Sequence, residues 1–340
     1  MRRLLPSIGL LAVAIFPLAA TAEDNSVGEK LPAAYSYASS TESESVLASF
    51  GDDSACQNGC AGSCDCCCSD GLLGGLIAPS DTCFTGFISP MTNPVFFEDP
   101  RTLTEARIIY LHHRVPQPAL GGDINLIACQ LRAAINDRLS VIATKDGYAT
   151  STNPLIDDGW ADVSAGLKYN LYADYERQRL LSAGLTYELP VGSTRTQQGN
   201  GDGLFNLFLT GGMEFGRNNR WVSGTGFLLP ADSGAESSLW FWSNHFDHRI
   251  GDTNLYGLVE FNWYHYMGSG RAFTLAPIEG GDLFNLGSVG VAGNDIVTGA
   301  FGLKYKPSNC VELGVAWELP LTDRRDVLDN RLTVDCILRY

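Results

Sequence analysis

Leu332–Tyr340, with the sequence LTVDCILRY, alternates strictly between two kinds of side chain. The apolar face ends the chain on an aromatic ring and carries Leu332, Val334, Cys336, Leu338 and Tyr340. The opposite face carries Thr333, Asp335, Ile337 and Arg339. This two-residue period predicts a β-strand, and a terminal strand of this kind is typical of the closing strand of a bacterial outer-membrane β-barrel. An edge strand of a soluble sandwich also alternates, so the rest of the chain has to agree.

Twelve segments are predicted as strands, with ten or fourteen as the alternatives. The alternation is clearest in residues 163–171, 181–189, 205–215 and 311–319. The predicted strands are 103–115, 124–135, 138–146, 160–172, 179–189, 204–215, 220–229, 239–248, 254–266, 296–306, 310–319 and 331–340. They predict an all-β fold: a transmembrane, antiparallel, up-and-down barrel.

The predicted connections alternate in length along the chain. The long ones are 116–123, 147–159, 190–203, 230–238, 267–295 and 320–330. The short ones are 136–137, 173–178, 216–219, 249–253 and 307–309. Long extracellular loops and short periplasmic turns distinguish membrane barrels, whereas the soluble alternative, a periplasmic sandwich or lipocalin-like barrel, gives no reason for this alternation.

The N-terminus predicts export. Arg2 and Arg3 precede an apolar run over residues 4–20, and Ala20–Ala22 offers a cleavage site, so residues 1–22 form a predicted signal peptide. Residues 23–102 are an acidic, Cys-rich periplasmic extension or plug, and residues 103–340 are the barrel. Within the extension, residues 71–101 fit a plug, a periplasmic cap or an approach to the first strand. The predicted location is the outer membrane of a Gram-negative cell.

The charge excludes one class of partner. The formal net charge is −15, which becomes −17 once Arg2 and Arg3 leave with the signal peptide. So acidic a chain argues against nucleic acid as a partner.

Short motifs at strand ends and turns carry a resemblance. A tight turn and strand span residues 136–148, and Glu-Leu-Pro follows an aromatic residue at both 187–190 and 317–320. With the terminal strand, these motifs resemble the outer-membrane barrels grouped as "MetA-pathway of phenol degradation" or transporter-like proteins, over about residues 90–340. The resemblance implies an outer-membrane protein that passes hydrophobic or aromatic compounds. The Cys-rich leader resembles versions from planctomycete-type bacteria and is no part of the general family pattern.

The cysteines favour disulfides. The spacing C-x3-C-x3-C-x-C-C-C lacks paired C-x-x-C knuckles, and the compartment is oxidising, so disulfides or cross-links between subunits are favoured over metal binding. The candidates are Cys56, Cys60, Cys64, Cys66, Cys67, Cys68 and Cys83. Cys310 and Cys336 fall on opposite faces of their hairpin and are not expected to pair. No metal site and no cofactor are predicted.

The charged residues of the strands share the face opposite the apolar one. The predicted pore-lining residues are Asp162, Lys168, Glu188, Glu214, Glu260, Lys304, Glu312, Glu318, Arg331, Asp335 and Arg339. Acids outnumber bases in this set, which predicts a weak preference for cations.

Catalytic motifs are missing from the sequence. His245 and His248 are three residues apart on a strand and therefore face opposite sides. His265 and Ser269 near the outer rim are the remaining candidates for a lipid-active enzyme, the least favoured interpretation. The chain is predicted not to be an enzyme.

These features together predict an outer-membrane channel for passive uptake of small molecules, with hydrophobic or aromatic compounds as candidates and loop 267–295 folded inward as a constriction. The alternative is a closed structural barrel whose Cys-rich extension binds a periplasmic partner. The other expected partners are outer-membrane lipid and the barrel-assembly machinery, which would recognise the C-terminal strand ending at Tyr340.

Overall fold

A computed structural model describes residues 71–340. The strands are β1 (Glu105–Arg114), β2 (Asp123–Ala134), β3 (Leu139–Lys145), β4 (Tyr148–Ser151), β5 (Gly159–Trp160), β6 (Val163–Asp174), β7 (Arg179–Leu189), β8 (Leu204–Phe215), β9 (Asn219–Pro230), β10 (Ser238–Arg249), β11 (Leu255–Gly268), β12 (Asp295–Ser308), β13 (Val311–Pro320) and β14 (Asn330–Arg339). The helices are short: α1 (Leu72–Gly75) and the 3₁₀ turns η1 (Gln117–Ala119) and η2 (Thr194–Thr196).

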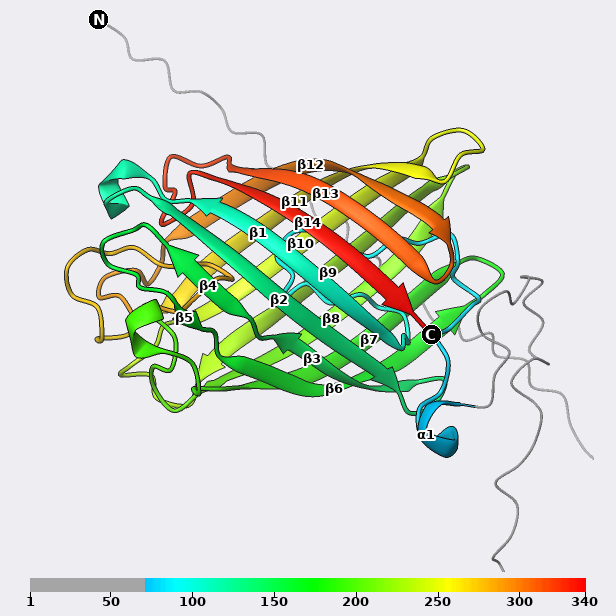
Figure 1. The fold of residues 1–340 in the computed structure, drawn as a ribbon, viewed down its shortest axis with the longest axis horizontal. Coiled ribbons are helices and arrows are strands. Elements are labelled where there is room, and N and C mark those ends of the chain that lie inside the picture. The colour runs from blue at the N-terminus through cyan, green and yellow to red at the C-terminus, as the bar shows by residue number, and fades with distance from the viewer. Residues whose placement is uncertain (1–70) are drawn as a thin grey trace, which may run out of the picture. The chain divides into compact units, whose positions relative to one another are not determined.

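The strands form one closed antiparallel sheet (Figure 1). Closure follows from the first strand, because β1 pairs with both β2 and β14. Two strands of the barrel wall each consist of two segments. The segments β3 and β4 both pair with β2. On their other edges, β3 pairs with β6 and β4 pairs with β5. The result is the expected barrel of twelve antiparallel strands.

Side chains alternate between the two surfaces of the wall. In β6, Leu167 is 53% exposed whereas the next residue, Lys168, is 2% exposed. In β14, Val334 and Leu338 face outward and Asp335 is buried, as its sequence predicts. The outer surface thus carries a continuous set of large apolar side chains, far more than a water-soluble monomer exposes.

The third predicted strand is longer than expected. The sequence predicts that it ends at residue 146 and that 147–159 is a loop, which is wrong for residues 148–151 because they form β4. The chain kinks at Asp146 and Gly147 and then resumes pairing with β2. Gly147 has φ +120°, and a Cβ there would lie 2.6 Å from the Ile127 carbonyl oxygen, so glycine is needed at the kink.

The two ends of the barrel differ. The long connections gather at the left of Figure 1, whereas the short turns lie at the right with α1 and the C-terminus. Of the helices among residues 71–340, none is long and apolar enough to cross a membrane.

Residues 78–104 contribute no strand to the sheet, and we call this segment the plug. It starts beside the strand ends, where the Ala78 and Ser80 amides donate to the carbonyls of Ala134 and Tyr340, both at 2.7 Å. It is then buried among inward-facing side chains, and Figure 1 draws it in cyan inside the ring of strands. Six of its large apolar side chains are at most 5% exposed: Phe84, Phe87, Ile88, Met91, Phe96 and Phe97. The sequence leaves three interpretations open for residues 71–101, and that the buried segment acts as a plug stays a prediction.

Candidate functional site in the barrel lumen

Ion pairs hold the plug to the wall. The Oε2 atom of Glu98 lies 2.6 Å from Nη2 of Arg132 in β2, and its Oε1 atom lies 2.9 Å from Nζ of Lys168 in β6. All three side chains are 2% exposed. Because water cannot compensate these charges, each depends on its partners.

Wall residues also satisfy the peptide groups of the plug. The Glu260 carboxylate accepts hydrogen bonds from the amides of Met91 at 2.7 Å and Thr92 at 2.6 Å. The Lys304 ammonium donates to the Ser89 carbonyl at 2.8 Å. A segment without regular secondary structure needs such partners for its peptide groups when it is shielded from water. This need explains why the inward-facing sides of the strands carry so many charged residues.

The plug also contacts the closing seam of the barrel. Arg339 of β14 donates to Glu105 of β1 at 2.7 Å and to the Ser89 hydroxyl of the plug at 2.8 Å. It also pairs with Glu312 of β13. One guanidinium therefore joins the first strand, the last two strands and the plug.

The structure places every predicted pore-lining residue on the interior side of the wall. They are Asp162, Lys168, Glu188, Glu214, Glu260, Lys304, Glu312, Glu318, Arg331, Asp335 and Arg339. Most bind the plug or one another, and Arg331 pairs with Glu318 and with Asp282 of the β11–β12 loop. That they line a path for solutes stays a prediction.

The predicted set omits most of the interior bases. The bases that it misses are Arg107, Arg132, Lys145, Arg220 and Lys306, and the acids are Glu105 and Asp247. With these added, acids and bases of the wall are equal in number. The acidic excess that motivated a cation preference therefore disappears.

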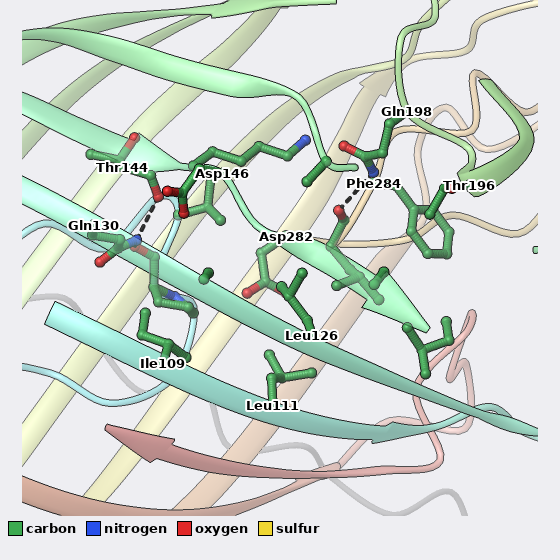
Figure 2. Close-up of a pocket in the computed structure, with 18 of the residues that line it drawn as sticks. Ile109, Leu111, Leu126, Gln130, Thr144, Asp146, Thr196, Gln198, Asp282 and Phe284 are labelled. Atoms are coloured by element: carbon green, nitrogen blue, oxygen red, sulfur yellow. Dashed lines mark hydrogen bonds between the residues drawn. The ribbon is translucent and has the colours of Figure 1, made fainter. Parts of the chain in front are cut away.

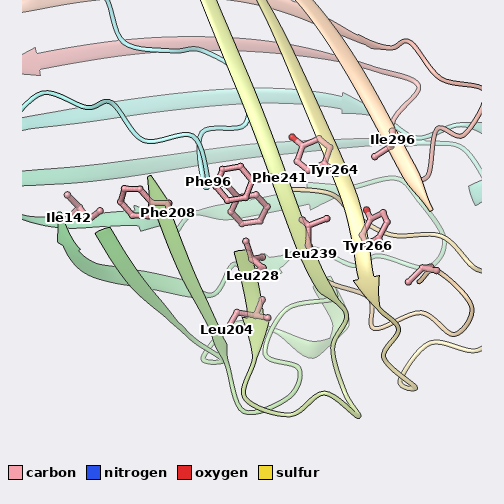
Figure 3. Close-up of a cluster of buried hydrophobic side chains, with 11 residues drawn as sticks. Phe96, Ile142, Leu204, Phe208, Leu228, Leu239, Phe241, Tyr264, Tyr266 and Ile296 are labelled. Atoms are coloured by element: carbon pink, nitrogen blue, oxygen red, sulfur yellow. The ribbon is translucent and has the colours of Figure 1, made fainter. Parts of the chain in front are cut away.

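An apolar cluster surrounds the tip of the plug in the half of the lumen that lies toward the long loops (Figure 3). Phe96 of the plug stacks on Phe241 of β10 with ring centroids 5.5 Å apart. The cluster also contains Ile142, Leu204, Phe208, Leu228, Leu239, Tyr264, Tyr266, Val291 and Ile296. A signal in the sequence could have revealed it, since residues 239–242 are apolar on both faces of the strand.

A cavity lies beside this cluster (Figure 2). One wall consists of inward-facing apolar side chains of β1 and β2: Ile109, Leu111, Ile124, Leu126 and Ala128. Across from them lie Phe284 of the β11–β12 loop and Thr196 and Gln198 of the β7–β8 loop. Pro94 and Val95 of the plug close another side.

The cavity is narrow. It contains about 650 Å³ not filled by protein, including its mouth, but the centre of a water molecule has only about 40 Å³ available. The β11–β12 loop takes part in closing it, because Gln198 donates to the Leu283 carbonyl at 3.2 Å. This loop contains the residues in which the sequence predicts a constriction.

The cysteines divide into two groups. Among the described residues, Cys83 and Cys310 each take part in a disulfide, whereas Cys129 and Cys336 are free thiols. Cys310 and Cys336 therefore do not pair with each other, as predicted. The clustered candidates lie outside the described residues, and their pairing stays a prediction: Cys56, Cys60, Cys64, Cys66, Cys67 and Cys68.

The histidines singled out in the sequence do not converge among residues 71–340. His245 is fully buried against Glu260, and His248 instead contacts Asn219, so the two diverge as predicted. His265 bonds to Asp295, and the Ser269 hydroxyl accepts from the Ala292 amide, with no hydrogen bond between the two candidates. Nor do three or more potential ligands gather as for a metal ion in this part of the chain.

Comparisons with known proteins show similar architecture and little sequence similarity. A COG4313 outer-membrane channel from Pseudomonas putida F1 has a TM-score of 0.49 at 10% identity, covering 75% of this chain and all of that one. The NanC porin has a TM-score of 0.44 at 8% identity (70% and 98% covered), and the KdgM porin 0.41 at 10% (69% and 99%). No model of a known protein family and no curated protein matches.

A carboxyl group in the β9–β10 loop makes that loop sensitive to pH. Burial raises the pKa of Glu236 from 4.5 to about 8, and the nearby Glu188 carboxylate adds to the shift, with Lys145 opposing it and Asp162 and Asp232 contributing. The folded loop favours the protonated form of Glu236. The stability of the loop therefore falls as the pH rises from about 4.5, the ordinary pKa of the carboxyl group, through about 8.

We therefore expect residues 231–237 to lose protection from hydrogen exchange between about pH 6 and pH 9, after correction for intrinsic rates. In the Glu236→Gln variant, the protection of this loop from hydrogen exchange should be the same at both pH values. Equal protection of the unaltered loop at both values would show that Glu236 does not control its packing.

Proposed function

We propose that this chain is an outer-membrane channel for passive uptake of small hydrophobic or aromatic molecules. The observation that carries the proposal is the apolar cavity within the lumen. A polar solute would be matched by a polar lumen, whereas the apolar wall of β1 and β2 excludes water and favours apolar bodies.

The outer surface supports a membrane location. Strand residues that point outward are apolar, as in Leu167 and Val334, while their neighbours Lys168 and Asp335 are buried inside. A closed barrel is one of the two structures that satisfy their backbone in lipid. The predicted signal peptide over residues 1–22, which lies outside the described residues, is consistent with export to this site.

The structure corresponds to a closed state in this scheme. The plug fills the lumen on one side of the cavity, and the loops narrow the other. Uptake therefore requires the plug or the β11–β12 loop to move, and the ion pairs of Glu98 and Arg331 set the cost of that motion. The strand-end motifs resemble those of MetA-pathway barrels, and this resemblance implies the same class of hydrophobic or aromatic molecules.

Substitution in the cavity wall tests the function. Leu126→Gln places an amide in the apolar wall, and we expect uptake of the aromatic dye N-phenyl-1-naphthylamine by Gram-negative cells expressing the chain to fall several-fold. Leu126→Ile is the matched control, because it keeps the volume and polarity. If dye uptake equals that of cells without the chain, or if both variants behave alike, the cavity is not part of an uptake path.

The second candidate function is a closed structural barrel whose Cys-rich extension binds a periplasmic partner. The filling of the lumen by the plug favours it. It predicts that neither the unaltered chain nor any cavity variant changes dye uptake, and that residues 23–70 recover a periplasmic protein.

A further inference from the structure

Two disulfide-bonded cysteines lie at the end of the barrel that carries the short turns. Cys83 belongs to the plug, and its carbonyl accepts a hydrogen bond from the Gln178 side chain in the β6–β7 turn at 3.0 Å. Cys310 lies in the turn between β12 and β13, where its carbonyl accepts from the Arg339 amide of β14 at 2.7 Å. Each of these two cysteines takes part in a disulfide, so each requires a partner cysteine.

These two cysteines lie on opposite sides of the barrel. In the order of the strands, the β6–β7 turn and the β12–β13 turn are separated by β8 to β11 in one direction and by β14, β1, β2 and β3 in the other. Twelve strands about 4.8 Å apart and tilted by about 40° form a barrel roughly 24 Å across. The Cα atoms of a disulfide lie within about 7 Å of each other, so Cys83 and Cys310 do not pair with each other.

The partners follow by elimination among the ten cysteines of the sequence. Cys129 and Cys336 are free thiols, so they are not the partners. The other six, which we call the cysteine cluster, are Cys56, Cys60, Cys64, Cys66, Cys67 and Cys68. Within one chain, this cluster is therefore the source of the sulfur atoms that Cys83 and Cys310 require.

The cysteine cluster is close enough in sequence to reach both sites. It ends three residues before Gly71, where the chain folds back on itself, because the Ile77 amide donates to the Leu72 carbonyl at 3.2 Å. The next amide, that of Ala78, donates to the Ala134 carbonyl at the short-turn end of β2. A stretch as long as the cluster spans up to about 40 Å when extended, which exceeds the width of the barrel.

From this juxtaposition we infer that the cysteine cluster forms a strap between the plug and the barrel wall, with one disulfide to Cys83 and another to Cys310. The plug passes into the lumen from the short-turn end, and its ion pairs, such as those of Glu98, can separate and form again. A strap bonded to both the plug and the wall keeps the plug close to its site after such a separation. The strap therefore adds a covalent lock to the non-covalent contacts of the plug.

Reduction is the step that opens this lock. A dithiol reagent gives two electrons and two protons to each bridge, the S–S bond becomes two thiols, and the reagent closes to its cyclic disulfide. After reduction, only the ion pairs, hydrogen bonds and apolar contacts hold the plug in the lumen. The inference therefore predicts both the pairing of the cysteines and a response of the plug to reductant.

Peptide mapping without reductant tests the pairing. The mature chain is isolated from outer membranes, its free thiols are blocked with N-ethylmaleimide under denaturing conditions, and it is cleaved before each aspartate. The peptides that separate the sites are 53–64 and 65–69 for the cysteine cluster, 81–98 for Cys83 and 295–322 for Cys310. We expect the Cys83 and Cys310 peptides each to be disulfide-linked to a peptide of the cluster, and Cys129 and Cys336 to carry the blocking group.

Single-channel recording tests the lock. Adding dithiothreitol to the intact mature chain in a planar bilayer should make openings about tenfold more frequent, because the plug loses its tether to the wall. Cys310→Ser should show the frequent openings without reductant, since its strap has no bond to the wall. Cys129→Ser removes an exposed free thiol and should behave like the unaltered chain. A heat-dependent shift in electrophoretic mobility shows that each barrel is folded.

The contrary outcomes are distinct. A link between the Cys83 and Cys310 peptides, or a dimer held by disulfides on a non-reducing gel, would overturn the pairing within one chain. Openings that stay equally rare after reduction of a folded barrel would show that the strap does not hold the plug, and the inference would fail. If Cys310→Ser does not fold, the reductant experiment on the unaltered chain decides alone. Frequent openings in Cys129→Ser would mean that loss of any cysteine loosens the barrel, which also overturns the inference.

Discussion

The mature chain without residues 23–101 should conduct ions steadily in a planar bilayer, with a conductance about tenfold or more above that of the intact mature chain. The interiors of eight-stranded barrels are filled by side chains, whereas barrels of 16–18 strands leave aqueous channels. Here the closed sheet has twelve strands, and residues of the plug such as Phe87, Met91 and Phe97 occupy its interior. Deleting them exposes the charged wall to water.

The control for the deletion is proof of a folded barrel, from a heat-dependent shift in electrophoretic mobility and a β-type circular dichroism spectrum. A folded barrel that conducts no more than the intact chain would mean that loops alone close the lumen. The apolar cluster around Phe96 and Phe241 would then be the barrier, and the plug would be structural.

Glu98→Gln should weaken the binding of the plug by about 3–5 kcal/mol, because it leaves two buried cations with one fewer partner. Arg132 and Lys168 both lie within 3 Å of the Glu98 carboxylate and are 2% exposed. The expected readouts are frequent openings in single-channel records and faster proteolysis of the plug in barrels that remain folded. Glu176→Gln, an exposed acid in the β6–β7 turn, is the matched control.

A compensating change sharpens this test. Adding Lys168→Met to Glu98→Gln removes one of the stranded cations and should restore part of the plug's stability. If Glu98→Gln alone leaves the single-channel record and the proteolysis rate unchanged, the buried ion pairs do not hold the plug.

The wall could be predicted from sequence because its signal is local. Alternation within nine residues places Val334 on the outer surface and Asp335 inside, and the lengths of the connections distinguish the two ends of the barrel. The kink at Gly147 is an exception. A break in one strand leaves the alternation on either side nearly intact, so the sequence alone predicts a loop where the structure has β4.

The plug and the cavity could not be predicted in the same way. Burial of the plug depends on contacts between residues far apart in sequence, as between Thr92 and Glu260, and its own residues have no period. The cavity wall was missed because β2 is apolar on both faces: Leu126 points inward and Ile127 outward. Parity identifies two faces but cannot say which apolar face meets lipid and which meets a solute.

Photolabelling of the intact mature chain in native outer-membrane vesicles tests the central claim most directly. A neutral aromatic diazirine of about ten carbon atoms is activated by light, and labelled residues are located by mass spectrometry. We expect labels on Leu126 and Phe284 in the cavity, and we expect labelling of Phe284 to be suppressed in Leu126→Gln and by excess unlabelled compound. Labels confined to outward-facing residues such as Leu167 and Val334, with none in the lumen, would contradict it.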